Sequence, residues 1–478
     1  MPPERRGAVA DVLERINRSF GAGAKTMENI QRLRTGSPAV VTGQQVALFG
    51  GPLFSLLKVL SVVTIAEKTN AVPVFWLATE DHDLEEINFA QFPSGDHLQT
   101  LRIDPPHTEG APVGTIAFPD EIGSLVDEIE KQFGSSEVLD LVRNSYCSGA
   151  SFGDAFGKLF TQLFAQFGLI LLDPSDIDLH RIARPIYRES FVRWKEINEA
   201  LLQRDHELEA AGYHAQVKVT PSHTLCFYLH HGARIPLRHD GQGFVAGELR
   251  FTHEELVAEA ENRPERFSAN VLLRPIIQDY LLPTLCYAGG PAETAYFAQV
   301  AAVYQKLLGR VTPVVPRVFS TLVESRQAKL LDRYQLTLPD IFRGPEKLRE
   351  FIAGKALPDS IMKSFDSAGE HLEQALAAIT GPLKKLDTTL ADAAENAGSK
   401  MRYQIQSLRD KAARAESRKN TETQRHADEL STLLYPNKNL QEREIAGIYF
   451  LLRHGTALLQ TLKEKLNSEC PGHQIVPI

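Results

Sequence analysis

The feature that most constrains the fold is a strand, helix and strand pattern within residues 39–77. Ala39–Thr42 is a short apolar run, an apolar segment extends from Pro52 to about Lys68, and Val72–Leu77 is a second short apolar run. Two neighbouring strands can run in the same direction only if a long connection, usually a helix, carries the chain back between them. This βαβ unit predicts an α/β fold with a parallel sheet, in which ligands bind at the carboxyl ends of the strands.

Further apolar runs extend the predicted sheet. Residues 168–172, 285–288 and 312–318 read as strands, and helices are expected at 1–34, between 122 and 167, up to about 208, and at 291–308. Two stretches interrupt this alternation, at 93–122 and 213–268, where short alternating segments lie among turn residues such as Asp240-Gly241. For 478 residues this pattern predicts one large core with insertions, or about three domains.

The chain changes character near residue 342. Its apolar residues then recur at alternating spacings of four and three, which is the seam of a coiled coil: Leu372, Leu376, Ile379, Leu383, Leu386 and Leu390. We expect two antiparallel helices, about 365–397 and 400–433, because Asn396–Ser399 resembles a helix end followed by a new cap. One continuous helix with a stutter is the alternative. An amphipathic helix at about 440–466 should pack back on the core.

Composition excludes several classes of function. The net charge of −8 provides no overall attraction for nucleic acid or an anionic membrane. No run approaches 18 apolar residues, and the charged start lacks the apolar region of a signal peptide. The four cysteines show no CxxC spacing, which argues against a disulfide scaffold and a thiolate zinc site. We therefore expect a soluble cytoplasmic protein that binds neither nucleic acid nor membrane.

Polar and glycine-rich segments follow the predicted strands. The loop Gly43-Gln44-Gln45 places two amides, each with a donor and an acceptor, where such a sheet presents ligands. Gly50-Gly51 and Gly289-Gly290 each precede a proline at a helix start, where free N–H groups can hold an anion. Ordinary turns would give the same patterns. No GxxxxGK[ST] and no GxGxxG after a strand occurs, which argues against a P-loop kinase and a dinucleotide dehydrogenase.

Acidic residues crowd the end of the second strand. Glu80, Asp81, His82 and Asp83 follow Val72–Leu77 within a few residues. Carboxylates this close suit a general base or an ammonium-binding site. An acidic helix start that satisfies the helix dipole is the alternative. Adjacent residues rarely all face one ion, so we predict no metal site.

Residues 272–299 interleave polar side chains with core-like apolar positions. Buried polar groups are costly unless they are paired, so these residues are candidates for function: Arg274, Gln278, Asp279, Tyr287 and Glu293. Arg274 and Arg317 could contact a carboxylate or phosphate with two parallel hydrogen bonds. Ion pairing within the core is the competing interpretation for both arginines.

Four long segments carry a family resemblance. TGQQVALFGGPLFSLLK (42–58), VPVFWLATEDHDLEEIN (72–88), LLRPIIQDYLLPTLCYAGGPAETAYFAQ (272–299) and PVVPRVFSTLVES (313–325) resemble the bacillithiol biosynthesis cysteine-adding enzymes, the BshC family. The resemblance implies a Rossmann-like core related to class I aminoacyl-tRNA synthetases, with two connecting-peptide insertions and a coiled coil that contributes to a homodimer. We assign 1–92, 123–212 and 269–341 to the core, 93–122 and 213–268 to the insertions, and 342–478 to the coiled-coil domain.

The same resemblance implies an activity. The implied activity is that of a cysteine ligase, which would join the carboxyl of L-cysteine to the amine of glucosaminyl malate, and kinship with synthetases suggests ATP. Asp81 or His82 would be the base, with Glu80 and Asp83 beside them. The residues assigned to substrate or nucleotide binding are Thr42, Gly43, Gln44, Gln45, Gly50, Gly51, Asn88, Arg274, Gln278, Asp279, Tyr287, Gly289, Gly290, Glu293 and Arg317. The alternative is a non-catalytic nucleotide- or sugar-binding protein that recruits a partner through its coiled coil.

Overall fold

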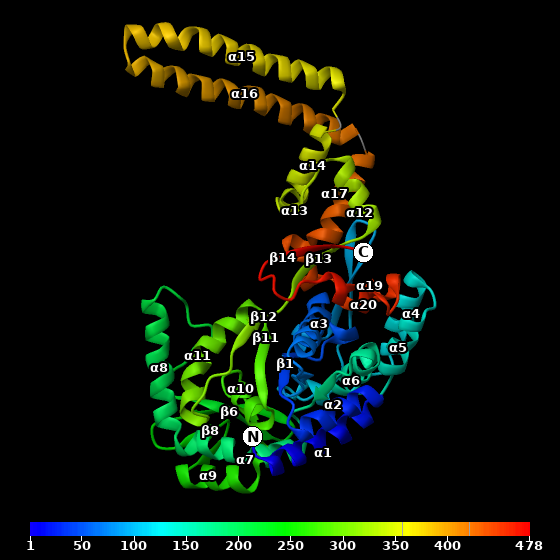
Figure 1. The fold of residues 1–478 in the computed structure, drawn as a ribbon, viewed down its shortest axis with the longest axis vertical. Coiled ribbons are helices and arrows are strands. Elements are labelled where there is room, and N and C mark those ends of the chain that lie inside the picture. The colour runs from blue at the N-terminus through cyan, green and yellow to red at the C-terminus, as the bar shows by residue number, and fades with distance from the viewer. Residues whose placement is uncertain (356, 420) are drawn as a thin grey trace. The chain divides into compact units, whose positions relative to one another are not determined.

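A parallel sheet lies in the first of two compact units of the computed structural model, which describes residues 1–355, 357–419 and 421–478 (Figure 1). The sheet has the order β12-β11-β1-β2-β5, and every neighbouring pair is parallel. Its strands are β1 (Ala39–Gln44), β2 (Val72–Leu77), β5 (Ile170–Leu172), β11 (Thr284–Gly289) and β12 (Val314–Pro316). The predicted α/β core with a parallel sheet is confirmed.

The first strand is longer than predicted. Gly43 and Gln44 were expected in a loop, but they pair with Trp76 and Leu77 of β2, and the Gln44 carbonyl accepts the Ala78 N–H at 2.9 Å. Gly43 and Gln44 are in a strand and not in a loop because β2 extends far enough to pair with both residues. The side chain of Gln44 is therefore held at the end of a strand instead of on a free turn.

Helices connect the strands and cover the sheet. The predicted βαβ crossover is α3 (Leu53–Lys68), whose side chains are mostly buried. The helical structure predicted at 1–34 is confirmed, but it is two helices instead of one, because the chain breaks around Gly21 at φ +82° and forms α1 and α2. The other α-helices before β12 are α1 (Pro3–Ser19), α2 (Ala24–Thr35), α4 (Ile122–Phe133), α5 (Glu137–Ser145), α6 (Phe152–Leu163), α7 (Ile177–Val192), α8 (Trp194–Ala210), α9 (His253–Asn262), α10 (Arg274–Leu281) and α11 (Pro291–Leu307).

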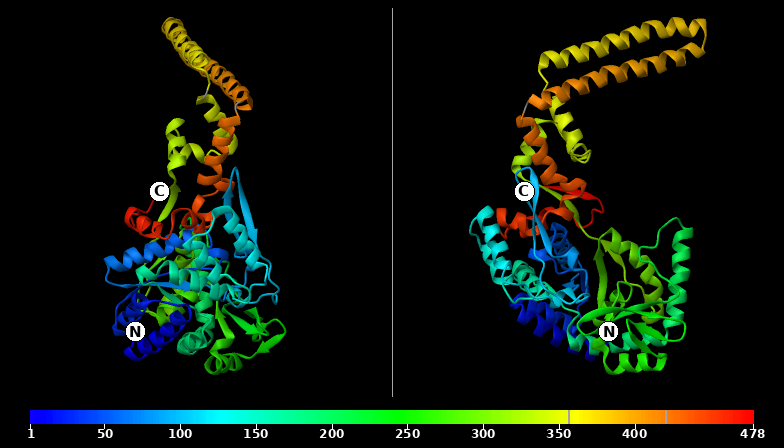
Figure 2. Two further views of the ribbon diagram at one scale, coloured as in Figure 1. Left: turned by 90° about the vertical axis from the view of Figure 1, so that its right-hand side faces the viewer. Right: turned by 180° about the vertical axis from the view of Figure 1, so that it is seen from behind.

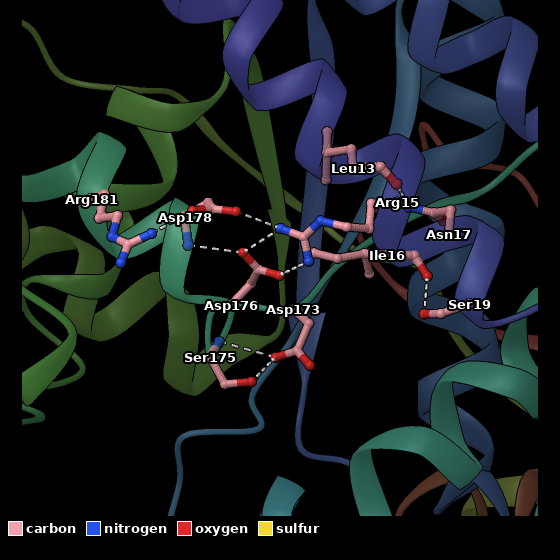
Figure 3. Close-up of polar contacts among 10 residues, drawn as sticks. All are labelled: Leu13, Arg15, Ile16, Asn17, Ser19, Asp173, Ser175, Asp176, Asp178 and Arg181. Carbon is pink, nitrogen blue, oxygen red and sulfur yellow. Dashed lines mark hydrogen bonds and ion pairs between the residues drawn. The ribbon is translucent and has the colours of Figure 1, made fainter.

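The side chain of Asn17 completes the open edge of the sheet at β5. Its Nδ2 donates to the Leu171 carbonyl at 2.8 Å, and its Oδ1 accepts the Leu171 N–H at 2.9 Å, as a neighbouring strand would. Beyond this edge, Arg15 of α1 pairs with Asp176 and Asp178 at the start of α7 (Figure 3). The first helix is thus tied to both the edge strand and the helix that follows it.

A second sheet is antiparallel, with the order β10-β6-β7-β8-β9. It lies within residues 213–269, where the sequence predicted short strands and turns. Its strands are β6 (His223–His230), β7 (Ala233–His239), β8 (Phe244–Ala246), β9 (Leu249–Phe251) and β10 (Phe267–Ala269), and β3 (Phe89–Ser94) pairs with β4 (His97–Arg102) as a separate hairpin. The predicted limits of the two connecting-peptide insertions stay predictions.

The chain forms two compact units. The first contains 1–92, 100–320 and 445–476, and the second contains 93–99, 321–444 and 477–478. The second unit has its own core of buried apolar residues, including Tyr334, Ile341 and Leu430. Its helices are α12 (Ser325–Arg333), α13 (Leu338–Ile341), α14 (Pro345–Lys355), α15 (Asp359–Leu386), α16 (Thr389–Lys419), α17 (Thr421–Leu434) and α18 (Gln441–Glu444).

The predicted helical hairpin is present, but its turn lies elsewhere. Helices α15 and α16 lie side by side (Figures 1 and 2), and the chain turns at Asp387, whose carboxylate accepts the N–H and hydroxyl of Thr389, both at 2.8 Å. The predicted turn at Asn396–Ser399 is wrong. Gly398 lies inside α16, where a Cβ would come within 2.8 Å of Leu376, so this glycine permits close helix packing.

The chain returns to the first unit after Glu444. The predicted helix at 440–466 is three separate helices, α18, α19 (Gly447–His454) and α20 (Leu458–Lys465), because backbone bonds to the first unit and a turn at Gly455 interrupt it. The Leu53 N–H donates to the Ile445 carbonyl at 2.9 Å, and the Gly447 N–H donates to the Gly51 carbonyl at 2.9 Å. The returning segment thus covers the start of α3.

The remaining elements are short. Strands β13 (Phe319–Val323) and β14 (His473–Pro477) lie where the chain passes between the units, and the 3₁₀ helices are 48–50, 84–86, 113–115, 165–167, 264–266 and 436–438. Among helices of the described residues, none is both long and apolar enough to span a membrane.

Candidate functional site

The candidate site lies where the strand order of the parallel sheet reverses. From β1 the chain adds β2 and β5 on one side, and later adds β11 and β12 on the other. The neighbouring strands β1 and β11 therefore form the switch point of the sheet, and open α/β sheets bind ligands outside the carboxyl ends of such strands. Thr42 joins these two ends, because its hydroxyl donates to the Ala288 carbonyl at 2.7 Å.

A buried lysine that the sequence analysis missed occupies this position. Lys58 of α3 donates to the Gly43 carbonyl at 2.7 Å and to Gln44 Oε1 at 2.9 Å, and it pairs with Glu293 at 2.9 Å. Burial lowers the pKa of Lys58, although Glu293 opposes this effect. A sequence signal existed, since Lys58 is the one charged residue between Val46 and Ala66 in a stretch that is otherwise largely apolar.

Glu293 links the lysine to the start of α11. Its carboxylate accepts the Tyr287 hydroxyl at 2.6 Å and the Gly290 N–H at 2.7 Å. Burial acts to raise the pKa of Glu293, but Lys58 and these two donors outweigh it and lower the pKa. The helix start that was predicted to hold an anion, at Gly289-Gly290, is thus already filled by a carboxylate of the same chain.

Arg274 lies beside this cluster without a carboxylate partner. It donates to the Tyr296 hydroxyl at 2.9 Å and to Gln278 Oε1 at 3.1 Å, and its guanidinium lies over the rings of Tyr287 and Trp76. Among the described residues it forms no ion pair. An arginine held by neutral groups keeps its charge available for an anionic ligand.

Two other residues of the 272–299 segment are structural. Gln278 donates to Asp279 at 3.0 Å, and Asp279 accepts the hydroxyls of Tyr304, at 2.6 Å, and of Thr312. Both Gln278 and Asp279 are buried. They form a hydrogen-bonded chain that fixes α10, and they leave Arg274 and Glu293 as the charged groups of this segment at the site.

The side chain of Arg317 is buried and does not face solvent at the site. It is only 2% exposed, donates to the Val318 carbonyl at 2.6 Å, and lies over the rings of Phe319 and Phe54. In this arrangement it contributes positive potential to the site, because it lowers the pKa of Lys58 together with Arg274, after the larger effect of burial. Direct contact with a ligand would require Arg317 to move.

The acidic segment after β2 does not converge on one point. Glu80 pairs with the buried His180 at 3.2 Å, whereas Asp81 accepts the Gln45 amide at 2.8 Å. His82 and Asp83 are exposed, and Asp83 makes no capping bond to the short helix that follows. Among the described residues, no group of three or more His, Cys, Asp or Glu side chains could hold a metal ion.

Arg234, from β7 of the second sheet, determines the state of His82. Its Nη1 lies 3.1 Å from His82 Nδ1, and the guanidinium stacks on Phe227. A guanidinium can only donate, so Nδ1 is the acceptor and the ring proton is on Nε2. The lone pair of His82 is therefore occupied. No sequence pattern indicated Arg234, because the contact joins residues 152 positions apart.

Three predicted ligand residues lie in other hydrogen bonds. The Gly50 N–H donates to the Tyr146 hydroxyl at 3.0 Å, and the Gly51 N–H donates to the Leu48 carbonyl at 3.0 Å. Asn88 donates to Asp104 at 2.6 Å. The glycine amides at the start of α3 are thus not free for an anion.

Comparison with known proteins agrees with this architecture. The family model for the N-terminal Rossmann-like domain of bacillithiol biosynthesis BshC matches residues 2–318, and the model for its C-terminal coiled-coil domain matches 320–478. The chain belongs to the BshC family. Relatives named "Putative cysteine ligase BshC" cover the whole chain and about nine tenths of their own length. The relative from Koribacter versatilis is 45% identical to this chain, which covers 90% of that relative's length. The relatives from Solibacter usitatus and Salinibacter ruber are 37% and 34% identical, and the chain covers 90% and 89% of their lengths.

The structure shows how the candidate site residues of this BshC family member are arranged. The switch point of the Rossmann-like domain brings together Gln44, Gln45, Asp81, Glu293 and Arg274 from the predicted set, and adds Lys58 and Arg234. It leaves Gly50, Gly51 and Asn88 in structural bonds.

Proposed function

We propose that this protein joins the carboxyl of L-cysteine to the amine of glucosaminyl malate, the last step of bacillithiol biosynthesis. The observation that carries the proposal is the match to cysteine ligases of the BshC family over the full chain. A cluster of charged and amide side chains at the sheet's switch point supports it.

The reaction needs activation of the cysteine carboxyl. A carboxylate is a poor electrophile, so we propose that ATP converts it to an acyl-adenylate with release of pyrophosphate, and that the amine then displaces AMP to form the amide. The glycine turns do not fit a triphosphate in this arrangement, since Tyr146, Leu48 and Glu293 already bond their N–H groups. The proposal of ATP therefore rests on the chemistry of amide formation.

Asp81 is our candidate for the base that takes a proton from the sugar amine. It is half-buried in the segment that follows β2. Its carboxylate accepts from Gln45 and from the His82 N–H and keeps further lone pairs, whereas the ring lone pair of His82 already accepts from Arg234. A general base must have a free lone pair within hydrogen-bond reach of the proton. We propose Arg274 as the group that binds a malate carboxylate, because neutral partners hold it.

A direct assay tests the activity. Purified protein is incubated with L-cysteine and glucosaminyl malate, with and without ATP, and bacillithiol, AMP and pyrophosphate are quantified by mass spectrometry. Bacillithiol formed with equal amounts of AMP and pyrophosphate supports the full proposal. Bacillithiol formed without ATP removes the adenylate step, and binding of the substrates without product would favour the non-catalytic alternative.

We also propose a cytoplasmic homodimer that uses the α15–α16 hairpin. Several large apolar side chains of this hairpin are exposed, including Ile379 at 50% and Leu386 at 79%. A second copy is the simplest cover for such a stripe, and closed twofold dimers are the commonest arrangement.

A further inference from the structure

The two adjacent glutamines at the site face neighbours of opposite charge. Gln44 Oε1 accepts from the Lys58 ammonium at 2.9 Å. Gln45 Nε2 donates to Asp81 at 2.8 Å and to Glu86 at 2.7 Å.

These neighbours fix which end of each amide faces outward. An ammonium only donates and an ionised carboxylate only accepts. A flipped Gln44 would point its NH₂ at the Lys58 ammonium, and a flipped Gln45 would point its carbonyl at two carboxylates. The oxygen and nitrogen of a glutamine are usually hard to distinguish, but here the charges determine them.

Lys58 is saturated in this arrangement. Its three protons have three acceptors, namely the Gly43 carbonyl, Gln44 Oε1 and Glu293 Oε2. Lys58 is 4% exposed, so water does not compete for these bonds. It therefore acts on a ligand only through Gln44 and is a positioning residue.

The opposite ends of both amides remain open. Within residues 1–355, 357–419 and 421–478, no described group bonds Gln44 Nε2 or Gln45 Oε1, and both side chains are partly exposed. Gln44 thus presents N–H donors close to the charge of Lys58. Gln45 presents a carbonyl oxygen at the end of its amide that faces away from Asp81 and Glu86.

We propose that Gln44 and Gln45 distinguish the two reacting groups, the cysteine carboxyl and the sugar amine, by polarity, an inference that rests on the proposed function. The Gln44 amide N–H binds a carboxyl or acyl oxygen of cysteine, with Lys58 as its positioning residue. The Gln45 carbonyl accepts a hydrogen bond from the amine of glucosaminyl malate, and Asp81 and Glu86 attract that amine in its protonated form. The groups that bind the carboxyl and the amine are thus side chains of adjacent residues at the end of β1.

Steady-state kinetics with each substrate varied in turn tests this assignment. Gln44→Glu and Gln44→Met both remove the outward donor, so each raises KM for cysteine about tenfold or more and leaves KM for glucosaminyl malate within about twofold. Gln45→Met gives the reverse pattern. The assignment is overturned if all three variants move both constants alike or move neither.

A second set of variants tests Lys58. The pair Lys58→Met with Glu293→Gln removes the ammonium without leaving a buried unpaired carboxylate. Gln44 is then free to flip, so KM for cysteine rises while KM for glucosaminyl malate does not. The control is Lys68→Met. Lys68 is on the same helix, and its half-exposed ammonium pairs with Glu469. If the double variant behaves like this control, Lys58 does not position Gln44.

The outcome separates this inference from the proposed function. If the wild type forms bacillithiol but the Gln44 and Gln45 variants show no substrate-specific effect, the function stands and the polarity assignment is wrong. If the wild type forms none, calorimetric titration of L-cysteine and of glucosaminyl malate into the same variants decides the assignment, because it predicts that each variant weakens one ligand only.

Discussion

Replacing Asn17 with alanine should destabilise the open edge of the parallel sheet. Asn17 is fully buried, and its side chain bonds both the N–H and the carbonyl of Leu171. Alanine leaves these two backbone groups buried without partners. Each such group costs about 1–3 kcal/mol, so the free energy of unfolding of this unit should fall by about 2–6 kcal/mol.

The assay should report on β5 itself, since a chain with two compact units need not unfold in one step. Amide hydrogen exchange, read by mass spectrometry on peptides that cover residues 169–173, serves this purpose. A loss of 2 kcal/mol corresponds to roughly 30-fold faster exchange of the β5 amides, because every 1.4 kcal/mol is a factor of ten. Urea unfolding followed by fluorescence gives an independent midpoint.

Asn262→Ala is the matched control. Asn262 is exposed in α9 and also donates to the carbonyl four residues earlier, at 2.8 Å, as Asn17 does to Leu13. This control lacks the bonds to a strand edge and is exposed instead of buried, so it should change stability by less than about 0.5 kcal/mol. Equal effects of the two substitutions, or unchanged exchange of β5 in Asn17→Ala, would refute the idea that the side chain acts as a sheet neighbour.

Three further predictions concern the site and the hairpin. Burial acts to lower the pKa of His180, but Glu80 outweighs this effect, so the net pKa is raised. The stability that this pair contributes should be complete below pH 6.5 and should be lost as the pH rises through the folded-state pKa. The free energies of unfolding of wild type and His180→Gln, measured by urea titration, should therefore converge over that interval. Arg274→Lys keeps the charge but loses the planar fork, so KM for glucosaminyl malate should rise about tenfold in initial-rate assays; an unchanged constant would make Arg274 structural. Leu383→Glu with Leu386→Glu should shift the protein from dimer to monomer in light scattering, and a monomeric wild type at micromolar concentration would contradict the dimer.

The sequence predicted the elements that local patterns determine. Val72–Leu77 was predicted to the residue, because a short apolar run between a helix end and an acidic turn has few other structures. The strand at Ala39 was predicted too short, since Gly43 and Gln44 pair only because β2 lies beside them. Local propensity contains no information about that neighbour.

The sequence could predict those residues of the candidate site that directly follow the ends of predicted strands. Gln44, Gln45 and Asp81 could be placed there from order along the chain alone. Arg234 could not, because its contact with His82 depends on how the second sheet folds. Gly398 was misread for a related reason, since a glycine that ends a helix and one that admits Leu376 look the same in sequence.

The return of residues 445–476 to the first unit has a consequence for how the protein is made. The backbone bonds that cover Leu53 and Gly51 come from Ile445 and Gly447, which leave the ribosome after residues 321–444 of the second unit. At about 5–20 residues per second, synthesis from residue 321 to 476 takes on the order of ten seconds. During that time the start of α3 is uncovered, so the first unit completes its folding only after residues 445–476 have been made. A truncated chain that stops at residue 320 would keep that nascent-chain defect permanently and should be a substrate for chaperones.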